Sequence, residues 1–109
     1  MLNTDYKFGE VYTLSNQIEA ADDKVQFKHI LATENGGTVL AAFKAGQKLD
    51  THTAPAELMV TVLEGEIVFT VFDKENTLKA GDFLLVGAGV PHSVLAKADS
   101  KMMLVKVKA

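Results

Sequence analysis

The amino-acid sequence predicts an all-β protein, a barrel or sandwich, in a single domain. Short runs of β-branched and aromatic residues recur along the chain, and turns rich in glycine or asparagine separate them. No segment has the pattern of a crossover helix, so a parallel α/β sheet is not expected. The 109 residues suit one domain, and 48% of them are hydrophobic, which is enough to build a core.

Composition and charge exclude several classes of protein. A membrane span is not expected, because the chain has no long uninterrupted apolar run. Asp5, Lys7 and Glu10 fall where a signal peptide would need apolar residues. The chain has no cysteine, a formal net charge of −3 and no basic cluster. We therefore expect a cytoplasmic protein without disulfides, whose partners are neither nucleic acid nor membrane.

The first 24 residues are expected to form an N-terminal arm, and residues 25–109 a β-barrel. A short helix is expected over Asn16–Ala21, because Asn16 is a suitable N-cap and Glu19 lies three residues later. Beyond this arm, alternation of apolar and polar residues predicts strands. The expected strands are Val25–Leu31, Thr38–Phe43, Leu58–Leu63, Ile67–Phe72, Phe83–Val86, His92–Leu95 and Met102–Val107.

Turns and lysines complete this outline. A turn is expected at Asn35-Gly36-Gly37, since Asn and Gly tolerate positive φ. Glu64-Gly65-Glu66 is expected to join two strong strands, and Lys74-Glu75-Asn76 to form another turn. Lysine on a sheet edge discourages unwanted strand pairing, and a solvated edge of this kind is expected for Lys97, Lys101, Lys106 and Lys108.

Two stretches, each beginning at a glycine, contain the residues that indicate a function. Residues 46–65 read GQKLDTHTAPAELMVTVLEG, and residues 81–92 read GDFLLVGAGVPH. Together they resemble the two motifs of the cupin superfamily, G-x5-H-x-H-x3-E-x6-G and G-x5-P-x-G-x2-H-x3-N. The resemblance implies a small single-domain cupin with a double-stranded β-helix, or jelly-roll barrel. It also implies a homodimer, for which Val25–Leu31 is the candidate strand for exchange between subunits.

The resemblance preserves only part of the family's metal site. That site takes two histidines and a glutamate from the first motif and one histidine from the second. His52 and His92 match two of these positions, whereas Ala54 and Leu58 stand at the other two. In the second motif, Gly87 replaces the usual proline and Ala96 the usual asparagine.

Strand alternation suggests which side chains share the cavity. Asp50, His52 and Ala54 share one face of an extended strand, and Leu58 and Val60 share one face of the next. The resemblance implies that these faces line the barrel interior. The expected ligand pocket is therefore formed by His52, Ala54, Leu58, Val60 and His92.

Two main functions remain open, and no catalytic residue is assigned. In the first, an apolar cavity with His52 and His92 as polar anchors binds a compact, partly apolar molecule that carries a carboxylate or carbonyl. The alternative is a metal-dependent oxygenase or isomerase with a divalent Fe, Mn, Ni or Zn ion. A sensor module that acts through a partner and a sugar epimerase with the two histidines as acid and base are further candidates.

The metal alternative needs a carboxylate, because two imidazoles are too few for a catalytic zinc or a non-haem iron centre. Asp50 or Glu57 would have to supply it. Glu57 would turn inward only through a bulge or register slip, which would push Leu58 to the other face. His29 is expected on the same strand face as Phe27, as a partly buried or interface histidine.

Overall fold

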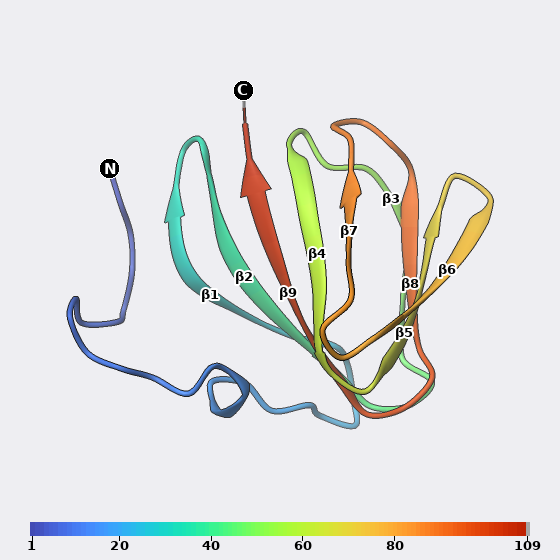
Figure 1. Ribbon diagram of the computed structural model, residues 1–109, viewed down its shortest axis with the longest axis horizontal. Coiled ribbons are helices and arrows are strands. Elements are labelled where there is room, and N and C mark those ends of the chain that lie inside the picture. The colour runs from blue at the N-terminus through green and yellow to red at the C-terminus, as the bar shows by residue number, and fades with distance from the viewer. Residues whose placement is uncertain (109) are drawn as a thin grey trace.

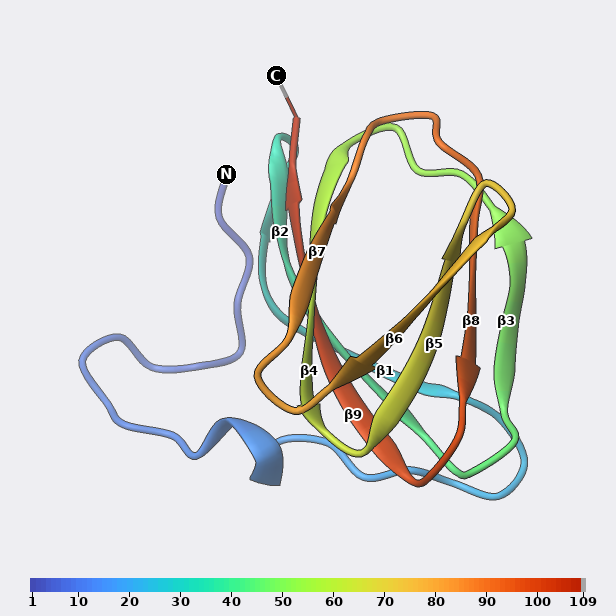
Figure 2. The same ribbon diagram turned by 45° about the vertical axis from the view of Figure 1, so that its right-hand side comes forward.

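The computed structural model describes residues 1–108, which form two antiparallel β-sheets that face each other (Figures 1 and 2). The strands are β1 (Gln26–Thr33), β2 (Gly36–Phe43), β3 (Lys48–His52), β4 (Glu57–Glu64), β5 (Glu66–Val71), β6 (Lys74–Lys79), β7 (Phe83–Val86), β8 (His92–Ala96) and β9 (Ser100–Val107). The first sheet has the order β1-β2-β9-β4-β7, and the second has the order β3-β8-β5-β6.

The chain passes repeatedly from one sheet to the other. It crosses between β2 and β3, β3 and β4, β4 and β5, β6 and β7, β7 and β8, and β8 and β9. This alternation is that of a jelly roll, and the prediction of an all-β jelly-roll fold is confirmed. The two sheets stay separate in their hydrogen bonding and do not close into one continuous barrel.

The connections gather at the two ends of the sandwich (Figure 2). The β2–β3, β4–β5, β6–β7 and β8–β9 connections lie at the lower end in this view. The β3–β4 and β7–β8 connections lie at the other end, which we call the upper end. Since β3 ends at His52 and β8 begins at His92, both histidines lie at the upper end.

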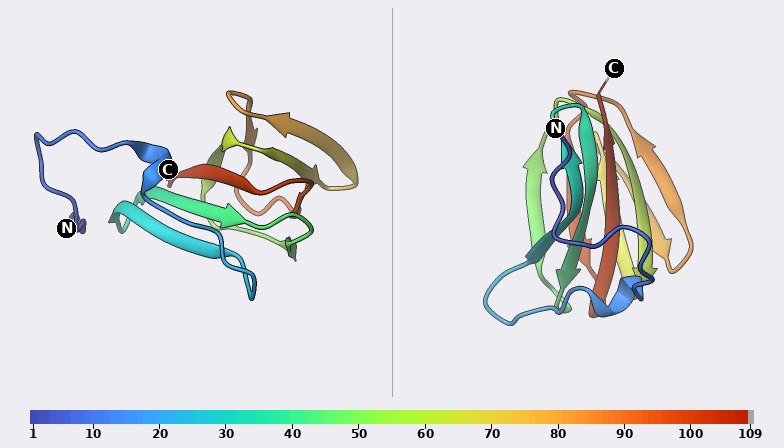
Figure 3. Two further views of the ribbon diagram at one scale, coloured as in Figure 1. Left: turned by 90° about the horizontal axis from the view of Figure 1, so that it is seen from below. Right: turned by 90° about the vertical axis from the view of Figure 1, so that its left-hand side faces the viewer.

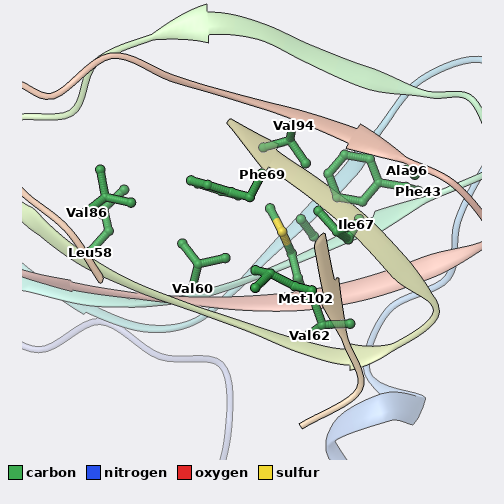
Figure 4. Close-up of a cluster of buried hydrophobic side chains, with 12 residues drawn as sticks. Phe43, Leu58, Val60, Val62, Ile67, Phe69, Val86, Val94, Ala96 and Met102 are labelled. Atoms are coloured by element: carbon green, nitrogen blue, oxygen red, sulfur yellow. The ribbon is translucent and has the colours of Figure 1, made fainter. Parts of the chain in front are cut away.

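The core fills the space between the sheets (Figure 4). In β4 the residues Leu58, Val60 and Val62 are buried, and the residues between them are less so, as the alternation of a half-covered strand requires. The largest fully buried side chains, Phe43 and Phe69, come from opposite sheets. Burial of apolar surface between the sheets is therefore the main force that holds them together.

The N-terminal arm differs from its prediction. The helix expected over Asn16–Ala21 is absent, and Leu14–Asn16 forms a single 3₁₀ turn, η1, in its place. Packing decides the outcome, because Ile18 is held in an apolar cluster with Leu40 and Ala42 on the outer face of the first sheet. Figure 3 shows the arm running along the outside of this sheet. Among residues 1–108, no helix is long and apolar enough to cross a membrane.

Lys101 fastens this arm to the sheet. Its Nζ donates to the carbonyl of Ser15 at 2.6 Å and pairs with the carboxylates of Glu19 and Glu64, each at 3.7 Å. The prediction that Lys101 lies on a solvated edge is wrong, because β9 lies between β2 and β4 in the middle of its sheet.

Every predicted strand is present, with ends that shift by a few residues, but two predicted turns are displaced. The turn expected at Asn35-Gly36-Gly37 falls at Glu34–Asn35, and the two glycines begin β2. Lys74-Glu75-Asn76 begins strand β6, and the turn falls one step earlier at Phe72–Asp73. β6 is an edge strand in which only Leu78 is buried, so its sequence lacks the apolar alternation that marks a strand. The strand β3 was likewise not predicted as a separate element.

Candidate ligand-binding site

His52 and His92 lie side by side at the upper end. They are partners in the β3–β8 ladder, and their ring centroids are 4.3 Å apart at an interplanar angle of 62°. His92 is only 3% exposed and stacks on the ring of Phe69, whereas His52 is exposed. One ring of the pair therefore lies in the core and the other at the protein surface.

Backbone carbonyls fix the tautomer of each histidine. His52 Nδ1 lies 2.8 Å from the carbonyl oxygen of Asp50, and His92 Nδ1 lies 2.9 Å from that of Val90. A carbonyl oxygen only accepts, so each Nδ1 must carry the hydrogen and donate it. In the neutral ring, Nε2 then keeps its lone pair and is a hydrogen-bond acceptor.

The Nε2 atoms are the free ends of the pair. Neither is hydrogen-bonded within residues 1–108. No buried side-chain nitrogen or oxygen atom in this part of the chain lacks a hydrogen-bond partner, so the Nε2 atom of His92 must reach accessible space. Both imidazoles therefore present an acceptor to whatever occupies the space beside them.

The buried histidine is neutral at neutral pH. Burial lowers the pKa of His92 below its ordinary value of 6.5, and repulsion from a charged His52 ring lowers it further. The hydrogen bond to the Val90 carbonyl opposes this shift but is weaker than the effect of burial. The acceptor role of the His92 Nε2 atom therefore holds under physiological conditions.

A cavity of about 510 Å³ opens beside the two histidines. Its volume is within the range of small-molecule pockets, roughly 300–1,000 Å³. Most of its wall is apolar, and it is lined by Phe27, His29, Val39, Leu49, Asp50, His52, Thr53, Ala54, Pro55, Leu58, His92, Leu104 and Lys106. Of the residues predicted from sequence for the pocket, Val60 does not line this cavity, because it is fully buried in the core one rung below Leu58.

The positions that the family's metal site would need are apolar here. Ala54 is half-buried and Leu58 is 4% exposed, and both line the cavity beside the histidines. The register of β4 is regular at Leu58, so no bulge turns Glu57 inward. The Glu57 carboxylate accepts a hydrogen bond from the backbone N–H of Ala88 at 2.9 Å and lines a hollow outside the cavity.

Asp50 is the one predicted carboxylate that lines the cavity, but its side chain is 89% exposed and pairs with Lys48 at 3.8 Å. Within residues 1–108, no group of three or more His, Cys, Asp or Glu side chains is placed to hold a metal ion. A catalytic zinc usually takes three protein ligands, and non-haem iron takes two histidines and a carboxylate. The donors in this arrangement therefore do not fit such a centre.

His29 and Lys106 also line the cavity, although the sequence patterns did not place them there. His29 pairs with Val39, and a register shift after it places Leu31 on the other face, which the simple alternation did not predict. Lys106 pairs with Leu58 in the middle of the first sheet and shares its inward face. The even spacing of Met102, Leu104 and Lys106 carried this information, but the lysine was assigned to a solvated edge.

Comparisons with known proteins agree with the fold. A conserved Streptococcus pyogenes protein of unknown function has a similar structure, with a TM-score of 0.89 and 24% identity over 97% of this chain and 93% of that chain. A cupin superfamily protein from Desulfitobacterium hafniense gives 0.86 and 23% over 93% of both chains. A cupin 2 conserved barrel domain protein from Leptotrichia buccalis gives 0.84 and 34% over 89% of this chain and 47% of that chain.

A search of curated proteins finds no match. The family model described as a cupin domain matches residues 39–108. This match spans more than half of the chain and includes His52, His92 and both motifs, residues 46–65 and 81–92. With the jelly-roll topology and the paired histidines at its upper end, the chain belongs to the cupin family.

Proposed function

We propose that this protein binds a small molecule in the upper-end cavity, with His52 and His92 as its polar contacts. The observation that carries the proposal is the pair of imidazoles, each held at Nδ1 by a backbone carbonyl two residues earlier and each free at Nε2. Rings held in this way lose little freedom when a ligand binds, which lowers the entropic cost of association.

The cavity chemistry narrows the ligand. Two Nε2 lone pairs accept hydrogen bonds, so a matching ligand places an O–H or N–H donor against them. Against the neutral rings, a carbonyl or carboxylate oxygen in the same place would face lone pairs and form no hydrogen bond, so such a group belongs elsewhere in the cavity. The apolar walls at Ala54 and Leu58 favour an apolar body. The supported ligand is therefore compact, partly apolar and equipped with a hydrogen-bond donor.

A thermal-shift screen tests this proposal. Compact apolar alcohols, amines and hydroxy acids are compared with polar sugars on the wild type, on Ala54→Leu, which fills the cavity, and on Ala88→Leu, a matched change in an exposed turn. We expect the apolar donors to raise the Tm of the wild type and of Ala88→Leu, but not of Ala54→Leu. Stabilisation by sugars alone, or an equal response of Ala54→Leu, would overturn the proposal.

The second candidate is a metal-dependent enzyme of the oxygenase or isomerase class. In its favour, metal-binding histidines usually donate their other ring nitrogen to a carbonyl or carboxylate, as His52 and His92 do. It also requires the Asp50 carboxylate to leave Lys48 and join them. Metal analysis of protein purified without chelator or nickel resin separates the two functions. Stoichiometric Fe, Mn, Ni or Zn that is lost in both His52→Ala and His92→Ala would favour the enzyme.

A further inference from the structure

The rim of the cavity carries two lysine side chains that form no ion pair within residues 1–108. Lys106 lines the main cavity and an adjoining hollow of about 310 Å³, and Lys108 lines the hollow. Neither lysine forms an ion pair within residues 1–108. The same lining includes two carboxylates, those of Asp50 and Glu34.

The acidic side chains of the same rim already have cations of their own. Asp50 pairs with Lys48 at 3.8 Å, and Glu34 pairs with the N-terminal amine at 3.3 Å. Both are exposed, so each pair is individually weak. Even so, neither carboxylate lies in contact with Lys106, and the ammonium group is left for an anion from solution.

The strand register sets Lys106 opposite the histidines. Lys106 pairs with Leu58 on one side and Gly37 on the other, so its side chain leaves the inner face of the first sheet. Gly37 has no side chain to cover it. His52 and His92 belong to the second sheet, across the same cavity. A molecule in the cavity therefore meets an ammonium group from one sheet and two acceptor nitrogens from the other.

We propose that the ligand is a small carboxylate that also carries a hydroxyl or N–H group, with the carboxylate on Lys106 and the donor on the histidine pair. This inference rests on the proposed function and adds the charge and orientation of the ligand. The orientation follows from chemistry, since an ammonium group only donates and a neutral imidazole with its hydrogen on Nδ1 only accepts at Nε2. The reversed placement would set a carboxylate against two lone pairs.

Two matched series of compounds test the inference, one built on hydroxybutanoate and one on mandelate. Each series has the hydroxy acid, its amide, which lacks the charge, and the acid without the hydroxyl. Binding is measured by NMR titration of the wild type, Lys106→Met, Lys106→Arg and the control Lys97→Met. Lys97 is exposed in the β8–β9 connection, so the control removes the same charge at the lower end.

We expect the hydroxy acid to bind the wild type more tightly than either analogue. Lys106→Met should weaken hydroxy-acid binding by about tenfold, because the ion-paired hydrogen bond to the carboxylate is lost, and should weaken amide binding much less. Lys106→Arg and Lys97→Met should bind like the wild type. The acid–amide comparison on the wild type needs no variant, so it stands even if Lys106→Met does not fold.

The outcomes separate this inference from the proposed function. If acid and amide bind the wild type equally, or if Lys106→Met binds the hydroxy acid as well as the wild type does, the inference is wrong. The proposal that the cavity binds a small molecule is then unaffected. If no compound of either series perturbs the histidine signals, the inference and the proposed pocket both fail.

Discussion

At the scale of the residue, His52 and His92 both match ligand positions of the family's motifs, but their environments differ. His92 is buried and stacked on Phe69, while His52 is exposed at the end of β3. Their Nδ1 atoms donate to carbonyls two residues earlier, so the His52 ring is held by β3 and the His92 ring by the β7–β8 connection. Ala54 and Leu58, at the two other positions of the family's metal site, are apolar and line the cavity beside the histidines.

The buried histidine should make folding stability depend on pH. Burial lowers the pKa of His92 in the folded protein, so between this pKa and 6.5 the unfolded chain binds a proton that the folded chain does not. The stability contribution is complete above the unfolded pKa, and it is lost as the pH falls from 6.5 toward the folded pKa. The free energy of unfolding should therefore fall more for the wild type than for His92→Gln between about pH 7.5 and about pH 5.5.

Urea unfolding at the two pH values checks this, with His29→Gln as the control. His29 is exposed, so this control removes a histidine while keeping the buried one. An identical loss of stability in the wild type and His92→Gln would contradict the prediction.

Replacing the apolar residues Ala54 and Leu58 with metal-binding side chains should create a metal site. The double variant Ala54→His, Leu58→Glu places an imidazole and a carboxylate beside His52 and His92 and supplies four ligands. We expect it to bind about one zinc ion after dialysis, whereas the single variants bind far less. Without metal, Leu58→Glu should lose about 2–4 kcal/mol of stability, because it buries a carboxyl group among apolar side chains. Calorimetric titration measures the affinity, and zinc binding that needs only one substitution would contradict the assignment.

At the scale of the element, the glycine between β4 and β5 decides how the chain changes sheets. Gly65 has a φ of 90°, and a Cβ atom there would collide with the Ser100 hydroxyl and the Asp99 carbonyl. The Ser100 hydroxyl accepts from the backbone N–H of Glu66 at 3.0 Å, so β5 and β9 close tightly around this turn. Any side chain at this position must push the two strands apart.

Gly65→Ala should therefore destabilise the fold more than Gly46→Ala. Gly46 has a nearly equal φ of 89°, but a Cβ atom there would meet no other atom within 4 Å. The conformational penalty, about 1–2 kcal/mol, should be common to both variants. The collision should add about 1–3 kcal/mol in Gly65→Ala alone. Equal midpoints of denaturant unfolding for the two variants would show that the close contact does not matter.

The sequence predicted the elements with apolar alternation and failed where alternation was absent. The alternation in β4 and β5 predicts strands because one face of each packs into the core, whereas β6 is polar and its first three residues resemble a turn. The arm helix failed because Ile18 is held by the sheet rather than by its neighbours in the chain. His52 and His92 were located by motif, but Lys106 and His29 were not, since their places depend on pairing between strands distant in sequence.

At the scale of the whole molecule, the two sheets bring distant segments to one cavity and leave part of the outer surface apolar. The arm covers the outer face near Leu40 with Ile18. Leu85 on β7 is 70% exposed, and with Met59, Val105 and Val107 it lines a hollow on the outside of the same sheet. Apolar surface of this kind is often covered by another protein surface.

We expect a second copy of the chain to cover this face. Light scattering coupled to size-exclusion chromatography should then give about twice the chain mass of 11.8 kDa. Leu85→Lys should shift the protein toward monomer, whereas Leu95→Lys, on the second sheet, should not. The strand proposed for exchange, Val25–Leu31, lies almost entirely in β1, which pairs with β2 of the same chain. A wild-type protein that stays monomeric at all concentrations would refute the expectation.

The most direct test of the proposed cavity uses the histidines themselves. The chain has three histidines, so selective ¹⁵N labelling of histidine gives a spectrum with few signals. In the free protein at about pH 8, where histidine rings are ordinarily neutral, His52 and His92 should show a protonated Nδ1 and an unprotonated Nε2. Titration with mandelate should move both Nε2 resonances in a saturable way, and Ala54→Leu should abolish the shift. Protonated Nε2 atoms in the free protein, or Nε2 resonances that no compound of either series moves, would contradict the account.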